Sequence, residues 1–122
     1  MSDFDTTFQQ IRELLKEFQQ QRDWEQFHDP KNLAEAISIE ASELMEHFLW
    51  KDKEKVIKEL KGNKELREEV GDELADIFAF AINFANTANF DISSIIKNKL
   101  EKAKKKYPID KAKGRAIKYN KL

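Results

Sequence analysis

The chain has 122 residues, with 22 Lys or Arg, 23 Asp or Glu, 3 Gly, 2 Pro and no Cys, and its formal net charge is −1. This length favours a single domain, and 40% hydrophobic residues suffice for a buried core. The lack of Cys excludes disulfides, thiolate metal sites and a cysteine nucleophile, and three scattered glycines exclude the common phosphate-binding loops. Neither an 18-residue apolar run nor a signal-peptide pattern is present, so we expect a cytoplasmic protein without a membrane partner.

Charge is distributed unevenly along the chain. Residues 97–122 contain 11 basic and 2 acidic side chains, a net of +9, which leaves a net of −10 on residues 1–96. This split fits mutual neutralisation, a nucleic-acid-binding tail, or a site that pairs metal-binding carboxylates with phosphate-binding lysines. Because an acidic body repels a long phosphate backbone, we expect no long nucleic acid as a partner and favour a short phosphorylated ligand.

Helical periodicity dominates the chain, and no strand pattern stands out. Helices are predicted over about 6–22, from Asn32 as N-cap to Trp50, over 51–61, over 64–86, and from Ile92 to just before Tyr107. The fold class is therefore all-α. We expect one domain spanning 1–122, with a four-helix core over about 6–106 and a basic tail over 107–122 with Gly114 as its hinge.

The helix predicted from Asn32 carries two carboxylates three residues apart, so that both lie on one face. Glu40 falls inside the apolar stripe, and Glu43 lies at its edge. A buried carboxylate without a partner is strongly unfavourable or becomes neutral through a shift of its pKa. Glu40 therefore needs a cation, a strong donor or solvent.

The helix predicted over 64–86 repeats this arrangement. Glu73 and Asp76 lead directly into the apolar run 77–82, which indicates a buried segment. Glu69 and Asp72 precede them on the same face, and for these two a solvated acidic stripe is an equally good explanation. Carboxylates that adjoin a buried segment are not expected to face open water.

Carboxylates that converge from two helices predict a cation site with oxygen ligands, which favours Mg²⁺, with Mn²⁺ as a substitute. A di-iron centre is the competing interpretation, but it usually requires Glu-x-x-His, and His47 follows Glu43 by four residues. We therefore prefer Mg²⁺ and expect His47 to lie on the helix surface. The expected ligands are Glu40, Glu43, Glu73 and Asp76.

Aromatic side chains gather in the first loop and at the end of the next helix. Trp24, Phe27 and His28 occupy the loop, and Trp50 closes the helix. These rings either cap the core or form a slot that stacks a planar base, an interaction worth roughly 1–3 kcal/mol per base.

The basic segment after residue 96 has two interpretations as well. Lys99, Lys102 and Lys106 share one helix face that can meet a polyphosphate, whereas a solvated face is the ordinary explanation for such a run.

The carboxylate pairs Glu40-Ala-Ser-Glu43 and Glu73-Leu-Ala-Asp76 resemble the ExxE…ExxD signature of the all-α MazG-like nucleotide pyrophosphohydrolases. The segment RDWEQFH at 22–28, together with Phe48-Leu-Trp50 and Lys106-Tyr-Pro108, resembles the dCTP pyrophosphatase branch of that family. The similarity covers most of the chain from about residue 18 to the end.

This resemblance implies a Mg²⁺-dependent hydrolase that converts a nucleoside triphosphate, dCTP or a modified dCTP, to nucleoside monophosphate and pyrophosphate in nucleotide-pool cleansing. It implies a homodimer or homotetramer, and the chemistry requires a base that deprotonates water, for which Glu40 and Glu43 are the candidates. Alternatives are a broad-specificity pyrophosphohydrolase and a non-enzymatic helical binding module. The implied substrate-binding residues are Trp24, Glu25, Gln26, Phe27, His28, Trp50, Phe80, Lys99 and Lys106.

Overall fold

The computed structural model describes residues 1–122, and it contains helices and turns but no strand. The all-α prediction is confirmed. No helix combines the length and the apolar character that crossing a membrane requires. The elements in chain order are α1 (Phe8–Gln21), the 3₁₀ turn η1 (Glu25–Phe27), α2 (Pro30–Glu46), α3 (Lys53–Gly62), α4 (Lys64–Ala88), α5 (Ile92–Lys106), α6 (Ile109–Ala112) and η2 (Tyr119–Lys121).

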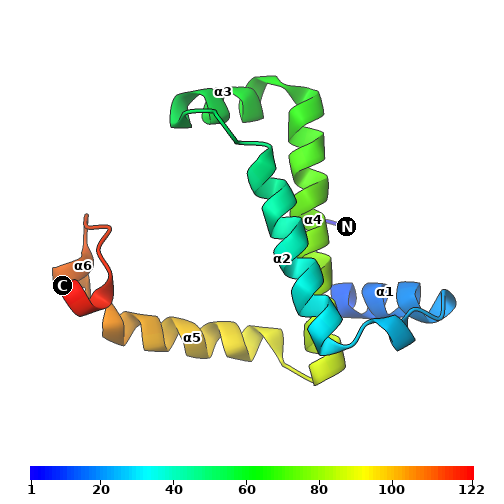
Figure 1. Cartoon of the computed structure of the whole chain (residues 1–122). Coiled ribbons are helices and arrows are strands. Elements are labelled where there is room, and N and C mark those ends of the chain that lie inside the picture. Colours follow the sequence, from blue (N-terminus) through cyan, green and yellow to red (C-terminus); the bar gives the residue numbers. More distant parts are fainter. The chain divides into compact units, whose positions relative to one another are not determined.

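Contacts divide the chain into two compact units, Met1–Asn89 and Phe90–Leu122. In the first unit α2 and α4 run side by side in opposite directions, and the short α3 links them at one end (Figure 1). At the other end α1 packs against α4. The most buried apolar side chains of this unit are Leu33, Leu66, Ile82 and Ala85. The single domain expected for the whole chain stays a prediction.

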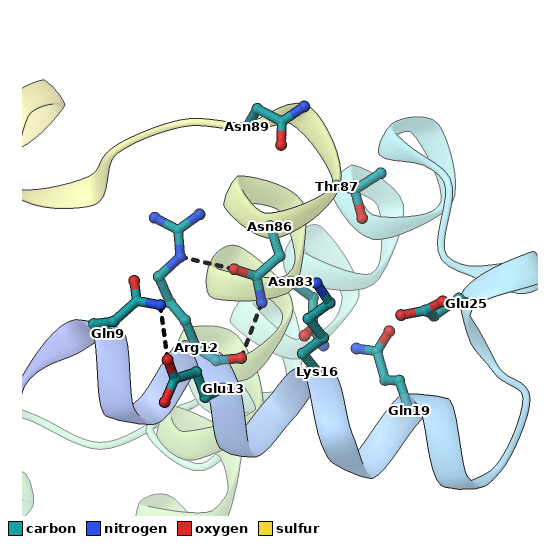
Figure 2. Close-up of a pocket in the computed structure, with 10 residues that line it drawn as sticks. All are labelled: Gln9, Arg12, Glu13, Lys16, Gln19, Glu25, Asn83, Asn86, Thr87 and Asn89. Atoms are coloured by element: carbon teal, nitrogen blue, oxygen red, sulfur yellow. Dashed lines mark hydrogen bonds between the residues drawn. The ribbon is translucent and has the colours of Figure 1, made fainter.

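A polar clamp joins α1 to the last turns of α4. The Arg12 Nε donates to Asn86 Oδ1 at 2.8 Å, and Asn86 Nδ2 donates back to the Arg12 carbonyl oxygen at 3.3 Å (Figure 2). Hydrogen bonds to a charged donor are stronger than those between neutral groups. This pair therefore sets where α1 crosses α4.

The start of α2 differs from the prediction, because Asp29 is the N-cap and not Asn32. Asp29 has extended backbone (φ −74°, ψ 163°), and its Oδ1 accepts from the Asn32 N–H at 2.9 Å. The residue before a proline favours extended backbone, which an N-cap requires, and Pro30 suits the first helical position. The side chain of Asn32 donates instead to the Phe27 carbonyl oxygen.

The far end of α2 also differs, since the helix ends at Glu46 and the predicted end at Trp50 is wrong. Residues 47–50 form turns, and Trp50 has left-handed backbone (φ +64°). A residue with left-handed backbone does not continue a right-handed helix, so α2 cannot extend through Trp50. The next helices follow the predicted positions closely, although α4 continues two residues further and ends at the left-handed Asn89.

In the second unit, α5 spans the predicted range. Its N-cap is Asp91, whose carboxylate accepts a hydrogen bond from the Ser94 N–H. The segment after Pro108, predicted as a basic tail, contains α6 and η2, and Gly114 has positive φ (+74°). The rings of Tyr107 and Tyr119 meet edge to face at 6.1 Å. This contact holds the final turn against the end of α5.

The capping role of Asp29 can be tested by Asp29→Ala. We expect the free energy of unfolding to fall by about 1 kcal/mol, because the Asn32 N–H loses its acceptor. Urea denaturation followed by circular dichroism measures this, with Asp3→Ala as the control at an exposed site. An equal loss in both variants would contradict the assignment.

Candidate active site

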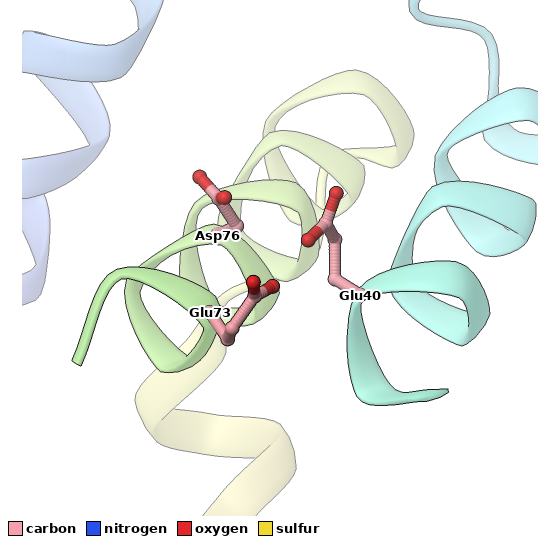
Figure 3. A group of neighbouring side chains, drawn as sticks. All are labelled: Glu40, Glu73 and Asp76. Carbon is pink, nitrogen blue, oxygen red and sulfur yellow. The ribbon is translucent and has the colours of Figure 1, made fainter. Parts of the chain in front are cut away.

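Three carboxylates meet where α2 faces the middle of α4. One oxygen from each of Glu40, Glu73 and Asp76 lies within 4.8 Å of the other two (Figure 3). Glu73 and Asp76 are one turn apart on α4, and Glu40 reaches them from α2. These distances suit a single cation held by carboxylate oxygens. Of the residues predicted as metal ligands, these three are brought together.

The buried part of this cluster lacks donors. Glu40 Oε2 and Glu73 Oε2 are both buried and have no hydrogen-bond partner. Burial, and then the neighbouring Glu73 and Glu43 carboxyls, raise the pKa of Glu40 from 4.5 to about 7. Buried carboxylate oxygens normally accept hydrogen bonds or bind a metal. The unpartnered oxygens therefore fit a hard divalent cation.

Glu43 lies beside Glu40, close enough to raise the pKa of the Glu40 carboxyl. It does not belong to the set of three mutually close oxygens. Its spacing of three residues from Glu40 on α2 gives it the same face. Its role as a fourth ligand stays a prediction.

His47, expected on the helix surface and not as a ligand, lies outside the set of three close oxygens and is partly covered by α4. Its side chain is 21% exposed, and its ring nitrogens lie 3.9 Å from Glu69 Oε2 and 3.8 Å from Glu73 Oε1. Since seven residues make nearly two helical turns, His47 shares a face with Glu40. This seven-residue step from Glu40 is the signal in the sequence that places His47 near the cluster. A protonated His47 would partly neutralise the acidic face.

A row of aromatic rings runs from α1 through the first loop to α4. The ring centroids of Phe18 and Trp24 are 5.7 Å apart in an edge-to-face arrangement, and those of Trp24 and His28 are 6.5 Å apart. The ring centroids of His28 and Phe80 are 6.4 Å apart, again edge to face. His28 Nδ1 is buried without a partner. Loop residues predicted to surround a base thus contact Phe80 of α4, one turn beyond Asp76.

The other predicted binding residues are placed differently. Trp50 is 99% exposed and lies at the opposite end of α2 from Trp24, so that the two rings of one chain do not form a single slot.

The remaining predicted residues of the first loop are also dispersed. Glu25 lines a polar cavity, and Phe27 is 59% exposed. Gln26 donates a hydrogen bond to Asp23 in its own turn. Lys99 and Lys106 belong to the second unit, and the Lys106 ammonium lies 4.6 Å above the Tyr119 ring. The binding roles of all these residues stay predictions.

The fold and the site define an all-α protein with a cluster of carboxylates between two antiparallel helices. Residues 35–122 match the MazG-like family. The dCTP pyrophosphatase 1 of Bos taurus is 35% identical over 116 residues, which cover 95% of this chain and 68% of that protein. The human protein of the same name is 33% identical over 116 residues, which again cover 95% of this chain and 68% of that protein.

A solved structure gives the same result. The crystal structure of a pyrophosphatase from Archaeoglobus fulgidus superposes with a TM-score of 0.78 at 31% identity, covering 88% of this chain and 98% of that one. The chain belongs to the MazG-like family.

The raised pKa of Glu40 predicts a stability that depends on pH in metal-free protein. Its folded pKa exceeds the unfolded value, so its contribution is fully present below about pH 4.5 and is lost as the pH rises through about 7. We expect the Tm of metal-free protein to fall between pH 5 and pH 8, and Mg²⁺ to raise it more at pH 8. Scanning calorimetry in EDTA and in Mg²⁺ measures both effects.

Glu40→Gln should flatten this pH dependence and abolish most of the stabilisation by Mg²⁺. Glu46→Gln, at an exposed position of the same helix, is the matched control and should behave like the wild type. Full Mg²⁺ stabilisation in Glu40→Gln would reject Glu40 as a ligand.

Proposed function

We propose that this protein is a divalent-cation-dependent hydrolase that cleaves a deoxynucleoside triphosphate, dCTP or a modified dCTP, to the monophosphate and pyrophosphate. The observation that carries this proposal is the cluster of Glu40, Glu73 and Asp76, whose two buried oxygens lack partners. Membership of the MazG-like family and similarity to proteins named dCTP pyrophosphatase 1 support it. The Archaeoglobus neighbour is likewise named a pyrophosphatase.

In this proposal Glu40, Glu73 and Asp76 hold Mg²⁺, and Glu43 completes the set from the adjacent position on α2. When bound, the ion neutralises phosphate charge and lowers the pKa of water near it. Oxygen ligands without sulfur match the preference of Mg²⁺ and Mn²⁺.

The protein supplies the groups that move and position protons. A carboxylate on α2, Glu40 or Glu43, accepts a proton from the attacking water, since Glu40 belongs to the cluster and Glu43 lies beside it. The chain has no cysteine, and the hydroxyl of Ser42 donates to the Ser38 carbonyl oxygen at 3.0 Å. His47, beside Glu69 and Glu73, limits the repulsion between carboxylates on α4 when it is protonated. The reaction is therefore direct attack by water on a phosphate.

The aromatic row supports a nucleoside next to this cluster. Phe80 follows Asp76 by one turn of α4 and contacts His28, which continues to Trp24. A base that lies against these rings has its phosphates toward the carboxylates. Lys99 and Lys106 are assigned to phosphate contacts because of their charge alone.

The activity is tested by incubating the protein with Mg²⁺ and each of the four dNTPs and CTP, with separate assays for monophosphate, pyrophosphate and orthophosphate. We expect monophosphate and pyrophosphate in equal amounts, fastest with dCTP. Orthophosphate as the main product, or no turnover of any nucleotide, would refute the proposal. Similar rates with every nucleotide would favour the broad-specificity alternative.

The carboxylate centre is tested by Glu40→Ala, which should lower kcat/KM at least 100-fold while circular dichroism retains the helical signal, because the cluster loses one of its ligands. Glu46→Ala on the outer face of α2 is the matched control and should stay within about twofold of the wild type. A Glu40→Ala variant that retains activity would remove this residue from the metal site.

We further propose that the protein forms a homodimer or homotetramer. The fully buried apolar core of one chain is small, and many large apolar side chains are exposed, including Phe8, Leu14, Phe78, Leu100 and Trp50. Exposed apolar surface of this extent marks association between chains. Analytical ultracentrifugation should give twice or four times the chain mass of 14.4 kDa, and a monomer at micromolar concentration would contradict this expectation.

A further inference from the structure

A polar cavity of about 520 Å³ lies between α1 and the last turns of α4. Figure 2 shows the side chains that line it. Its charged residues are two cations, Arg12 and Lys16, and two anions, Glu13 and Glu25, so it carries no net charge. The other lining side chains are the amides Gln9, Gln19, Asn83, Asn86 and Asn89 and the hydroxyl Thr87. Such a lining suits a neutral ligand with hydrogen-bond donors and acceptors better than a phosphate.

Two of these amide side chains are almost fully buried, which is uncommon for Gln and Asn. Gln19 is 7% exposed and Asn83 is 6% exposed, and Asn83 Oδ1 has no hydrogen-bond partner. A buried acceptor without a donor is unfavourable, because it has given up its hydrogen bonds to water. The neighbouring Asn86 is engaged with Arg12 and does not supply that donor. An acceptor left in this state beside a cavity points to a donor on a ligand.

The cavity continues the face of α4 that carries the carboxylates. Asn83 follows Asp76 by seven residues, nearly two full turns, so both project in almost the same direction roughly 10 Å apart along the helix. Phe80, which contacts the His28 ring, lies between them. This separation corresponds to the span of a nucleotide from its phosphates to the far edge of its base.

We propose that Asn83 and Gln19 read the hydrogen-bonding edge of the nucleobase and select cytosine. This inference rests on the proposed function, because it places the phosphates of the same substrate at the carboxylates. Asn83 Oδ1 accepts from the exocyclic N4 amine of cytosine, and the Gln19 amide donates to N3. Thymine presents an acceptor, O4, in place of that amine, and so gives Asn83 Oδ1 no donor in the orientation that the structure shows. Sites built to hydrogen-bond a substrate reject analogues that leave buried polar groups unpaired.

The test compares kcat/KM for dCTP and dTTP in the Asn83→Leu and Gln19→Leu variants of the full chain. Both substitutions keep the approximate volume and remove the hydrogen bonds. We expect the ratio of dCTP to dTTP to fall about 10-fold in each variant, chiefly through slower dCTP turnover. Gln20→Leu, at the exposed neighbouring position of α1, is the matched control and should keep the wild-type ratio.

A second measurement does not depend on turnover or metal. Calorimetric titration of dCMP and of dTMP in EDTA should show weaker dCMP binding, by about 10-fold, in both leucine variants and not in the control. If Asn83→Leu fails to fold, Gln19→Leu decides the outcome by the same two readouts.

The proposal is overturned if folded variants keep the wild-type ratio within twofold, or if the wild type itself does not distinguish dCTP from dTTP. Either result leaves the hydrolase activity standing, because that activity is judged by the products of the wild type. Loss of all turnover in the wild type would instead refute the proposed function.

Discussion

The central constraint on this structure is that several carboxyl groups lie close together where α2 packs against α4. Glu40 and Glu73 carry buried oxygens without donors, and burial among other carboxyls raises the pKa of Glu40 to about 7. Like charges in a partly dry site are unfavourable unless they are protonated or shared by a cation. A helical protein that needed only a core would have apolar residues at these positions. The packing of α2 against α4 therefore brings together carboxylates that a bound cation would stabilise.

The long helix α4 positions most of the other side chains at the candidate site. Glu73 and Asp76 lie near its middle, Phe80 follows one turn later, and Asn83 lies one turn beyond that. Since a helix places residues seven apart on one face, a single straight element can address the phosphates, sugar and base of one ligand. The Arg12–Asn86 clamp holds α1 over the last of these positions and forms the wall of the polar cavity.

Similarity to known proteins and the geometry agree on the class of chemistry. This MazG-like chain is similar to proteins named dCTP pyrophosphatase 1 and to an Archaeoglobus pyrophosphatase, and its carboxylate cluster is chemically suited to the hydrolysis of a phosphate. Within one chain Trp24 and Trp50 lie at opposite ends of α2, and much apolar surface is exposed.

Much of this protein was predictable because helical periodicity is local. Spacings of three residues, inside an apolar stripe for Glu40 and next to a buried run for Glu73 and Asp76, were enough to predict these carboxylates together with Glu43 as one set, since a charge beside buried apolar residues needs a partner. The structure brings three of the four together. Contacts between helices were not predictable from spacing. The position of His47 against Glu69 and Glu73 depends on how α2 faces α4. Gln19 and Asn83 line the same cavity because of where α1 crosses α4. Local spacing is enough to predict the helices and the acidic pairs, because both depend on residues a few positions apart. The side chains around those carboxylates follow from the packing of helices that are distant in the chain.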